Sequence, residues 1–145
     1  MADDAELRTI LATCPTIAVL GIHSAREKPA FYVPDYLHDQ GYRIVGVNPG
    51  LAGQVLFGEP VRATLAELAE PVDLVDIFRR PEAIGAHVPD ILSMSPRPRV
   101  VWFQLGIRND AAARTLEDAG ITVIQDRCTL ADHRRLRVGP PARAR

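Results

Sequence analysis

Five short runs of aliphatic and β-branched residues recur along this chain, and longer amphipathic stretches separate them. Each run has the length and composition of a strand that is buried on both faces of a sheet. Strands that alternate with helices predict a parallel sheet joined by right-handed crossovers. The expected strands span residues 16–21, 43–47, 72–78, 99–104 and 121–125.

The stretches between these runs carry helical signals. Thr64 and Glu67 have the spacing of a capping box, Pro81 suits a first helical position, and Gly120 suits a helix end. We therefore predict an α/β fold, a doubly wound domain with a five-stranded, mainly parallel sheet flanked by helices. The expected helices span residues 4–13, 30–40, 81–94, 110–119 and 129–136, with a further short helix after Thr64.

Composition excludes several classes of protein. Hydrophobic residues make up 47% of the chain and charged residues 24%, which is ordinary for a globular domain. No apolar run approaches the ~20 residues that a membrane span needs, and the acidic first residues do not form a signal peptide. Cys14 and Cys128 lie too far apart for a disulfide framework or a zinc motif, so we expect a reducing, cytoplasmic location.

The charge balance bears on the choice of partner. The formal net charge is −1, which argues against nucleic acid as the main partner. Residues 134–145 hold five arginines and no acidic residue, so the remaining chain is net acidic. An anion would therefore be held by a local basic cluster. Residues 137–145 lack periodicity and are expected to form a mobile basic tail.

Ligands of open parallel sheets bind beyond the carboxyl ends of the strands, near the switch point. The first such loop has Gly21 but no G-x-G-x-x-G motif, since His23, Ser24 and Arg26 stand where further glycines are expected. Ser24 can donate a hydroxyl hydrogen bond, and Arg26 and Lys28 can meet phosphate. This loop is therefore a candidate phosphate site of an unusual kind.

The ends of the next strands carry further candidates. Asn48 and Pro49 replace the acidic residue of NAD enzymes, which disfavours nicotinamide binding, although a plain turn explains the pair equally well. Arg79 and Arg80 precede a predicted helix, either as an anion-binding pair or as solvated surface residues.

Gln104 and Gly106 follow the fourth strand, where glycine permits close approach of a ligand or simply makes a turn. The chain has no P-loop and no G-x-S-x-G motif, and its four histidines lack metal-ligand spacing. Cys128 is interpreted as a packed residue rather than a reactive thiol. We therefore expect neither a catalytic nor a metal site.

Five segments taken together resemble the small stand-alone CoA-binding proteins. The Rossmann-like domain of that family is also the N-terminal domain of the succinyl-CoA synthetase alpha subunit. The resemblance covers residues 16–136, and we expect residues 1–136 to form one CoA-binding domain. The matching segments are residues 17–21 with Ser24, Lys28 and Pro29, then residues 41–49, 72–82, 101–109 and 123–128.

The resemblance implies that the ADP moiety of coenzyme A crosses the strand ends. It places phosphates against the first loop, Asn48 and Pro49 beside the nucleotide, and Phe78 and Arg79 on the adenine or phosphate side. One departure is Leu51, which stands where the synthetase has a CoA-contacting lysine. The candidate cofactor-binding residues are Gly21, His23, Ser24, Arg26, Lys28, Pro29, Asn48, Pro49, Phe78, Arg79, Arg80, Gln104 and Gly106.

The chain is too short to contain the synthetase's second domain with its phosphorylated histidine. The resemblance therefore implies non-catalytic binding of CoA or acyl-CoA. Two alternatives stay open: an NAD(P)-type nucleotide-binding protein, and a regulatory subunit of a CoA-dependent complex that docks through its arginine tail. We expect a small nucleotide ligand and neither nucleic acid nor a membrane as partner, and we leave open a protein partner or a homo-oligomer.

Overall fold

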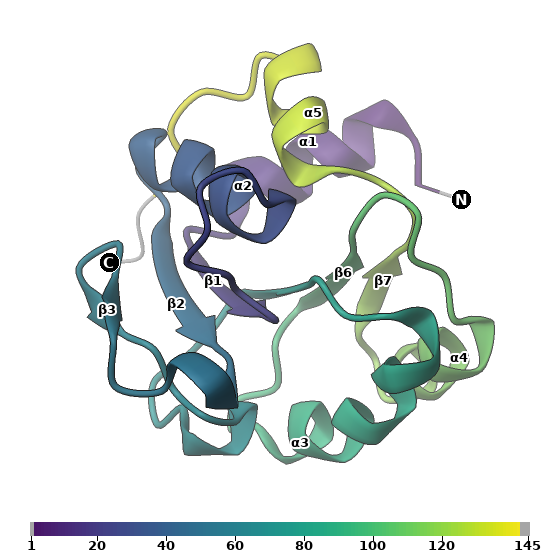
Figure 1. Cartoon of the computed structure of the whole chain (residues 1–145). Helices are drawn as coiled ribbons and strands as arrows, with labels where there is room; N and C mark the ends of the chain where they lie inside the picture. Colours follow the sequence, from purple (N-terminus) through teal and green to yellow (C-terminus); the bar gives the residue numbers. More distant parts are fainter. Residues whose placement is uncertain (1, 143–145) are drawn as a thin grey trace.

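The computed structural model describes residues 2–142 and has one central five-stranded sheet with helices on both faces (Figure 1). The strand order is β2-β1-β5-β6-β7 and every neighbouring pair is parallel. This confirms the predicted α/β class, with a sheet that is entirely rather than mainly parallel. The strands are β1 (Thr16–Leu20), β2 (Arg43–Val47), β5 (Leu74–Ile77), β6 (Val100–Phe103) and β7 (Thr122–Ile124).

The helices divide into two layers (Figure 1). One layer contains α1 (Asp4–Thr13), α2 (Pro29–Asp39) and α5 (Thr129–Arg135), and the other contains α3 (Val88–Ser93) and α4 (Asp110–Asp118). Alternate strand residues point into each layer: Ile17 and Val19 belong to the first core, and Ala18 and Leu20 belong to the second. Both faces of the sheet are therefore buried, as the unbroken apolar runs predicted.

The helix predicted over residues 81–94 forms as two shorter pieces. A 3₁₀ helix, η3 (Pro81–His87), is followed by α3 (Val88–Ser93). Gly85 weakens the helical conformation, and Pro89 has no N–H for a backbone hydrogen bond. The capping box predicted at Thr64 is confirmed, and it begins the 3₁₀ helix η2 (Leu65–Glu67).

A small antiparallel hairpin, β3 (Val55–Leu56) and β4 (Glu59–Pro60), lies beyond β2 and was not predicted. It follows a 3₁₀ turn, η1 (Pro49–Leu51). Arg43 on β2 holds the hairpin through Glu59 at 2.8 Å and also pairs with Glu70 at 2.9 Å. The hairpin's only apolar run, Val55 to Phe57, is three residues long and shorter than the predicted strands, so the sequence did not indicate a strand there.

The segment predicted to be a mobile tail begins at residue 137, and the structure describes its first part. Gly139 O accepts a hydrogen bond from His133 Nε2 at 2.7 Å, and Ala142 N donates to Ala12 O at 2.8 Å. Residues 143–145 lie outside the described residues. Within residues 2–142, no helix has both the length and the apolarity needed to cross a bilayer.

Candidate functional site

The switch point of the sheet lies between the carboxyl ends of β1 and β5. The chain passes from β1 to β2 on one side of β1, and the later strands begin with β5 on the other side of β1. Gly21 follows β1 and Phe78 follows β5. Gly21 has φ +87°, and a Cβ atom added there would lie 2.4 Å from Phe78 O. Glycine at this position therefore lets the two strand-end loops approach each other directly.

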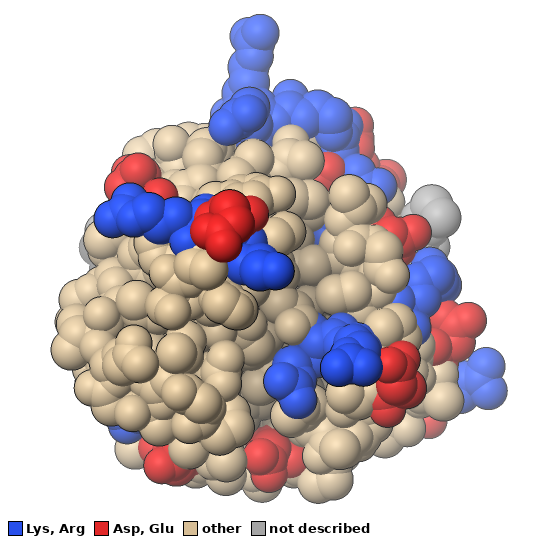
Figure 2. All heavy atoms as spheres, in the orientation of Figure 1, with Lys and Arg blue, Asp and Glu red and all other residues tan. Residues whose placement is uncertain are grey.

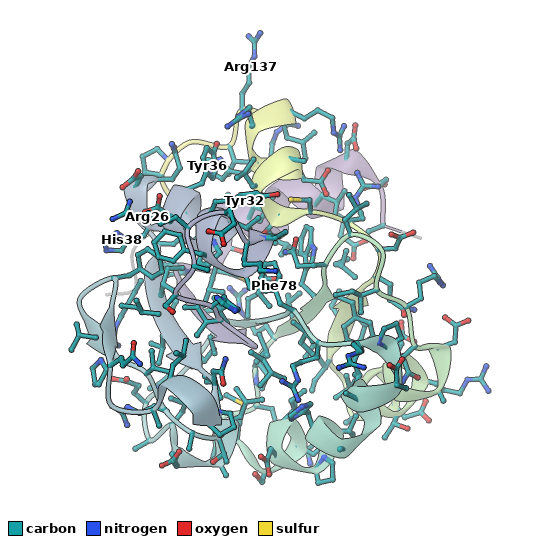
Figure 3. The ribbon with its side chains drawn as sticks, viewed as in Figure 1. Arg26, Tyr32, Tyr36, His38, Phe78 and Arg137 are labelled. Carbon is teal, nitrogen blue, oxygen red and sulfur yellow. The ribbon has the colours of Figure 1, made fainter. Side chains whose placement is uncertain are left out.

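A cavity of about 570 Å³ opens at this edge. The start of α2, the loop after β5, the loop after β6 and the residue that precedes α5 form its walls. Figure 3 shows Tyr32 and Phe78 near one another over the central part of the molecule. The lining residues are Gly21, His23, Lys28, Pro29, Ala30, Tyr32, Val33, Phe78, Arg79, Arg80, Pro81, Gln104, Leu105, Ile107 and Cys128.

Three of these lining residues, Lys28, Arg79 and Arg80, are cationic. On the face seen in Figure 2, basic side chains lie on more than one side of the central region. Arg79 Nε is buried and has no hydrogen-bond partner within residues 2–142. A buried donor without a partner is rare, because it forfeits hydrogen bonds to water. The Arg79 guanidinium is therefore suited to receive an anionic oxygen.

A smaller cavity of about 260 Å³ adjoins the first, and both are lined by Gly21 and Arg79. Asn48 and Pro49 line only this second cavity, together with Thr64 and His87 among others. Burial lowers the pKa of His87, and the positive charge of Arg79 lowers it further, which favours a neutral imidazole. The two cavities meet at Gly21 and Arg79.

Asn48 holds the loops after β1 and β2 together. Its Nδ2 donates to Ile22 O at 2.8 Å, and its Oδ1 accepts from Gly50 N at 2.9 Å. Asparagine can make both contacts, whereas aspartate has no donor for the Ile22 carbonyl. This bond pattern gives a physical reason for the absence of the acidic residue that NAD enzymes carry here.

We expect Asn48→Asp to lower the free energy of unfolding by about 1–3 kcal/mol, because the Ile22 carbonyl loses its donor and faces a carboxylate oxygen. Urea denaturation measures the change. Gln54→Glu, which adds the same charge at an exposed position nearby, is the control and should stay within about 0.5 kcal/mol of wild type. Equal effects of the two variants would contradict the role given to Asn48.

Three candidates from the sequence line neither of these two cavities: Ser24, Arg26 and Gly106. Ser24 is exposed. The Arg26 guanidinium lies 5.7 Å from the Phe31 ring centroid, and Figure 3 shows Arg26 beside His38 and away from Phe78. Gly106 N donates to Asp126 Oδ1 at 2.6 Å, which accounts for Gly106 as a turn residue.

Several lining residues were missed by the sequence analysis, because their signal is that of ordinary packing residues. Tyr32 and Leu105 are exposed hydrophobic side chains at the cavity, with 47% and 70% of their surface accessible. Val33 and Ile107 also line it. Together they give the cavity an apolar wall beside its cationic residues.

Asp76 was also missed, although its sequence signal is an acidic residue inside an apolar run. It lies on β5 with no exposed surface, and its carboxylate bonds to Gln104 and Thr129. Burial raises the pKa of Asp76 to about 7, against the two hydrogen bonds, which lower it. Among residues 2–142 no three His, Cys, Asp or Glu side chains lie together as metal ligands.

The fold and the strand-end cavities define a Rossmann-like domain of the doubly wound class. Residues 15–134 match the CoA binding domain family, and the chain belongs to that family. Confirmation of the family resemblance does not extend to the individual candidate residues, which stay predictions.

Two relatives have similar lengths. The protein YneT of Bacillus subtilis is 32% identical over 129 residues, which cover 89% of this chain and 93% of YneT. The structure of cell-free ID.343 from Thermus thermophilus is 48% identical, with a TM-score of 0.88 over 93% of this chain and 99% of that one.

The same fold occurs inside a larger protein. A dinucleotide-forming acetyl-coenzyme A synthetase 1 of Korarchaeum cryptofilum matches 78% of this chain and 26% of its own, with a TM-score of 0.65 and 15% identity. At this identity the likeness concerns the fold alone.

Proposed function

We propose that this protein binds CoA or acyl-CoA without carrying out chemistry on it, through the ADP moiety at the carboxyl ends of the strands. Membership of the CoA binding domain family supports a ligand of this kind. The switch-point cavity combines cationic and apolar walls, which suits a ligand with phosphates at one end and an apolar arm at the other.

The observation that carries the proposal is the position of Arg79. This residue lines both cavities, and its buried Nε has no partner among the described residues. The Nη atoms of Arg79 also make no side-chain hydrogen bond within residues 2–142, and they are not fully buried, so they can donate charge-assisted hydrogen bonds to a bound phosphate. Lys28 and Arg80 line the same cavity and add positive charge for further phosphates.

The apolar wall fits the remainder of the ligand. Tyr32, Val33, Leu105 and Ile107 offer a surface for the pantetheine arm and for an acyl chain. Cys128 also lines the cavity, and burial raises the pKa of its thiol, which favours the protonated form over a nucleophilic thiolate. A protonated thiol accords with binding in the absence of covalent chemistry.

Thermal denaturation with CoA, dephospho-CoA, NAD, NADPH and ATP tests the function. Ligand at about 100 times its dissociation constant adds ~2.7 kcal/mol to stability. In a domain near this size each kcal/mol raises Tm by roughly 2–8 °C. We expect a shift of that order with CoA and none with NAD. No shift with CoA, or a larger shift with NADPH, would contradict the proposal and favour the nicotinamide alternative.

Replacement of Arg79 by alanine tests where the phosphates lie. If Arg79 meets the 3′-phosphate, Arg79→Ala weakens CoA binding by about 1.5–3 kcal/mol more than dephospho-CoA binding. Isothermal titration calorimetry measures both affinities. Arg114→Ala is the matched control, because Arg114 is exposed on α4 and lines neither cavity. An equal loss for both ligands would move Arg79 to the pyrophosphate, and no loss for either would remove it from the site.

A further inference from the structure

A closed set of three polar side chains lies beside the switch-point cavity. Asp76 on β5, Gln104 after β6 and Thr129 at the start of α5 are all buried. Gln104 Nε2 lies 2.6 Å from Asp76 Oδ1 and 2.8 Å from Thr129 Oγ1, and Thr129 Oγ1 lies 3.1 Å from Asp76 Oδ2. Of the three residues, Gln104 lines the cavity.

The hydrogen bonds within this set leave one arrangement when Asp76 is ionised. Carboxylate oxygens only accept, so the Gln104 atom beside Asp76 must be the NH₂ group. One of its hydrogens goes to Asp76 and the other to Thr129 Oγ1, and the Thr129 hydroxyl donates its own hydrogen to Asp76. Every donor of the three side chains is therefore used within the set.

The atom that remains is Gln104 Oε1. Within residues 2–142 it accepts no hydrogen bond from a side chain or from the backbone. It is also not one of the polar atoms that are both fully buried and without a partner. Because Gln104 lines the cavity, its carbonyl oxygen is the polar group that it offers there. An oxygen that only accepts recognises an N–H or O–H of a ligand and disfavours a phosphate oxygen.

We propose that Gln104 is a specificity-determining residue and Asp76 its positioning residue: the Asp76 carboxylate fixes the Gln104 amide so that Oε1 accepts from an amide N–H of the pantetheine arm. This inference rests on the proposed function. The apolar walls formed by Tyr32, Leu105 and Ile107 suit that arm better than they suit phosphates. The adenine amino group is the other N–H donor of CoA, and the test separates the two.

The arrangement makes recognition sensitive to pH. Burial raises the pKa of Asp76 to about 7. Once protonated, Asp76 can donate to a rotated Gln104 Oε1, and the amide NH₂ then faces the cavity in place of the acceptor. Of the residues that face Asp76, Gln104 and Thr129 do not titrate, and Cys128 keeps a raised thiol pKa. CoA affinity should therefore fall as the pH drops below about 7.

The experiment compares CoA with 3′-phospho-ADP capped as a methyl ester on its terminal phosphate (called 3′-phospho-ADP below), which lacks the pantetheine arm but carries the same adenine and the same ionisable phosphate oxygens. Calorimetry at about pH 6 and about pH 8 gives the ratio of the two affinities. We expect the preference for CoA to fall about 3- to 10-fold at the lower pH, because one charge-oriented hydrogen bond is worth about 0.5–1.5 kcal/mol. In Asp76→Asn the ratio should be low and independent of pH.

Asp73→Asn is the matched control, because Asp73 lies beside the opposite end of the same strand and should keep the pH response. A preference for CoA that does not change with pH in the wild type overturns the inference. If the affinities for both ligands change equally with pH, by more than their shared phosphates explain, the contact belongs to adenine and the inference is also overturned. The wild-type comparison decides even if Asp76→Asn does not fold. Failure of the wild type to bind either ligand would instead overturn the proposed function.

Discussion

Gly21→Ala should lower the free energy of unfolding by about 2–5 kcal/mol. The backbone at Gly21 has φ +87°, a conformation that costs an L-residue about 1–2 kcal/mol. The new Cβ would lie 2.4 Å from Phe78 O and 3.0 Å from Arg79 Cδ, so the loop after β5 must move. Overpacking of this kind costs about 1–3 kcal/mol more. Urea denaturation followed by far-UV circular dichroism measures the sum.

Gly53→Ala separates the two contributions. Gly53 has φ +88°, nearly the same as Gly21, but an added Cβ there meets no atom within 4 Å. This control should therefore lose only the conformational term, about 1–2 kcal/mol. Equal losses in the two variants would show that the approach of the strand-end loops has no energetic importance. Gly21→Ala should also weaken CoA binding, because the displaced loop carries Arg79.

The sheet could be predicted from sequence because four of its strands are buried at nearly every position and therefore have mostly apolar runs, whereas the edge strand β7 is exposed at Thr122. The run at 43–47 matches β2 to the residue, whereas β5 is shorter than its predicted run of 72–78. At its start, Asp73 accepts a side-chain hydrogen bond from Thr16 N at 3.0 Å, so a side chain satisfies that backbone group where the strand begins. Apolar content alone cannot show where a side chain takes the place of a neighbouring strand as the hydrogen-bond partner of the backbone.

The parts that sequence could not supply depend on tertiary contacts. The hairpin at β3 and β4 is held by the ion pair between Arg43 and Glu59, which are 16 positions apart. Similarly, Lys28 lines the cavity and Arg26 turns toward Phe31, although both belong to the same loop. The strand-end rule identifies which loops surround a ligand. Which side chains of a loop enter the site is decided by the packing of that loop.

Asp76 shows a different limit of sequence analysis. An acidic residue within an apolar run is easy to recognise, but its neighbours in sequence do not indicate its role. An acidic residue in an apolar run predicts either an exposed edge or a buried carboxylate with partners. The partners Gln104 and Thr129 come from segments 28 and 53 positions away. Only the fold brings them together, so their joint role in orienting Gln104 could not be read from sequence.

The unfolding free energy should contain a component that decreases with pH on account of Asp76. Its pKa is raised from 3.8 to about 7 in the folded protein, so folding favours the protonated form. This contribution is full below about pH 4, declines as the pH rises toward 7, and is absent above it. The total change is on the order of 4 kcal/mol, at about 1.4 kcal/mol for each pK unit. Asp76→Asn, which cannot ionise, should lack this component.

The measurement is urea denaturation of the wild type and Asp76→Asn at several pH values between about 4 and 8. The difference in unfolding free energy should shift in favour of the variant as the pH rises. Asp110→Asn provides the control: hydrogen bonds from Gln125 and Arg108 hold the pKa of Asp110 below its usual value of 3.8, so its contribution to stability changes mainly below about pH 4 and the difference between this variant and the wild type should be nearly constant across the range.

A difference that does not vary with pH would mean that the Asp76 carboxylate is not destabilised by burial, and the proposed coupling of its ionisation to Gln104 would fail with it. An Asp76→Asn variant that gains stability at neutral pH but loses the preference for CoA over 3′-phospho-ADP would support the coupling between Asp76 and Gln104. In that case a buried carboxylate is kept at a cost in stability, because an asparagine in its place does not fix which end of the Gln104 amide faces the ligand.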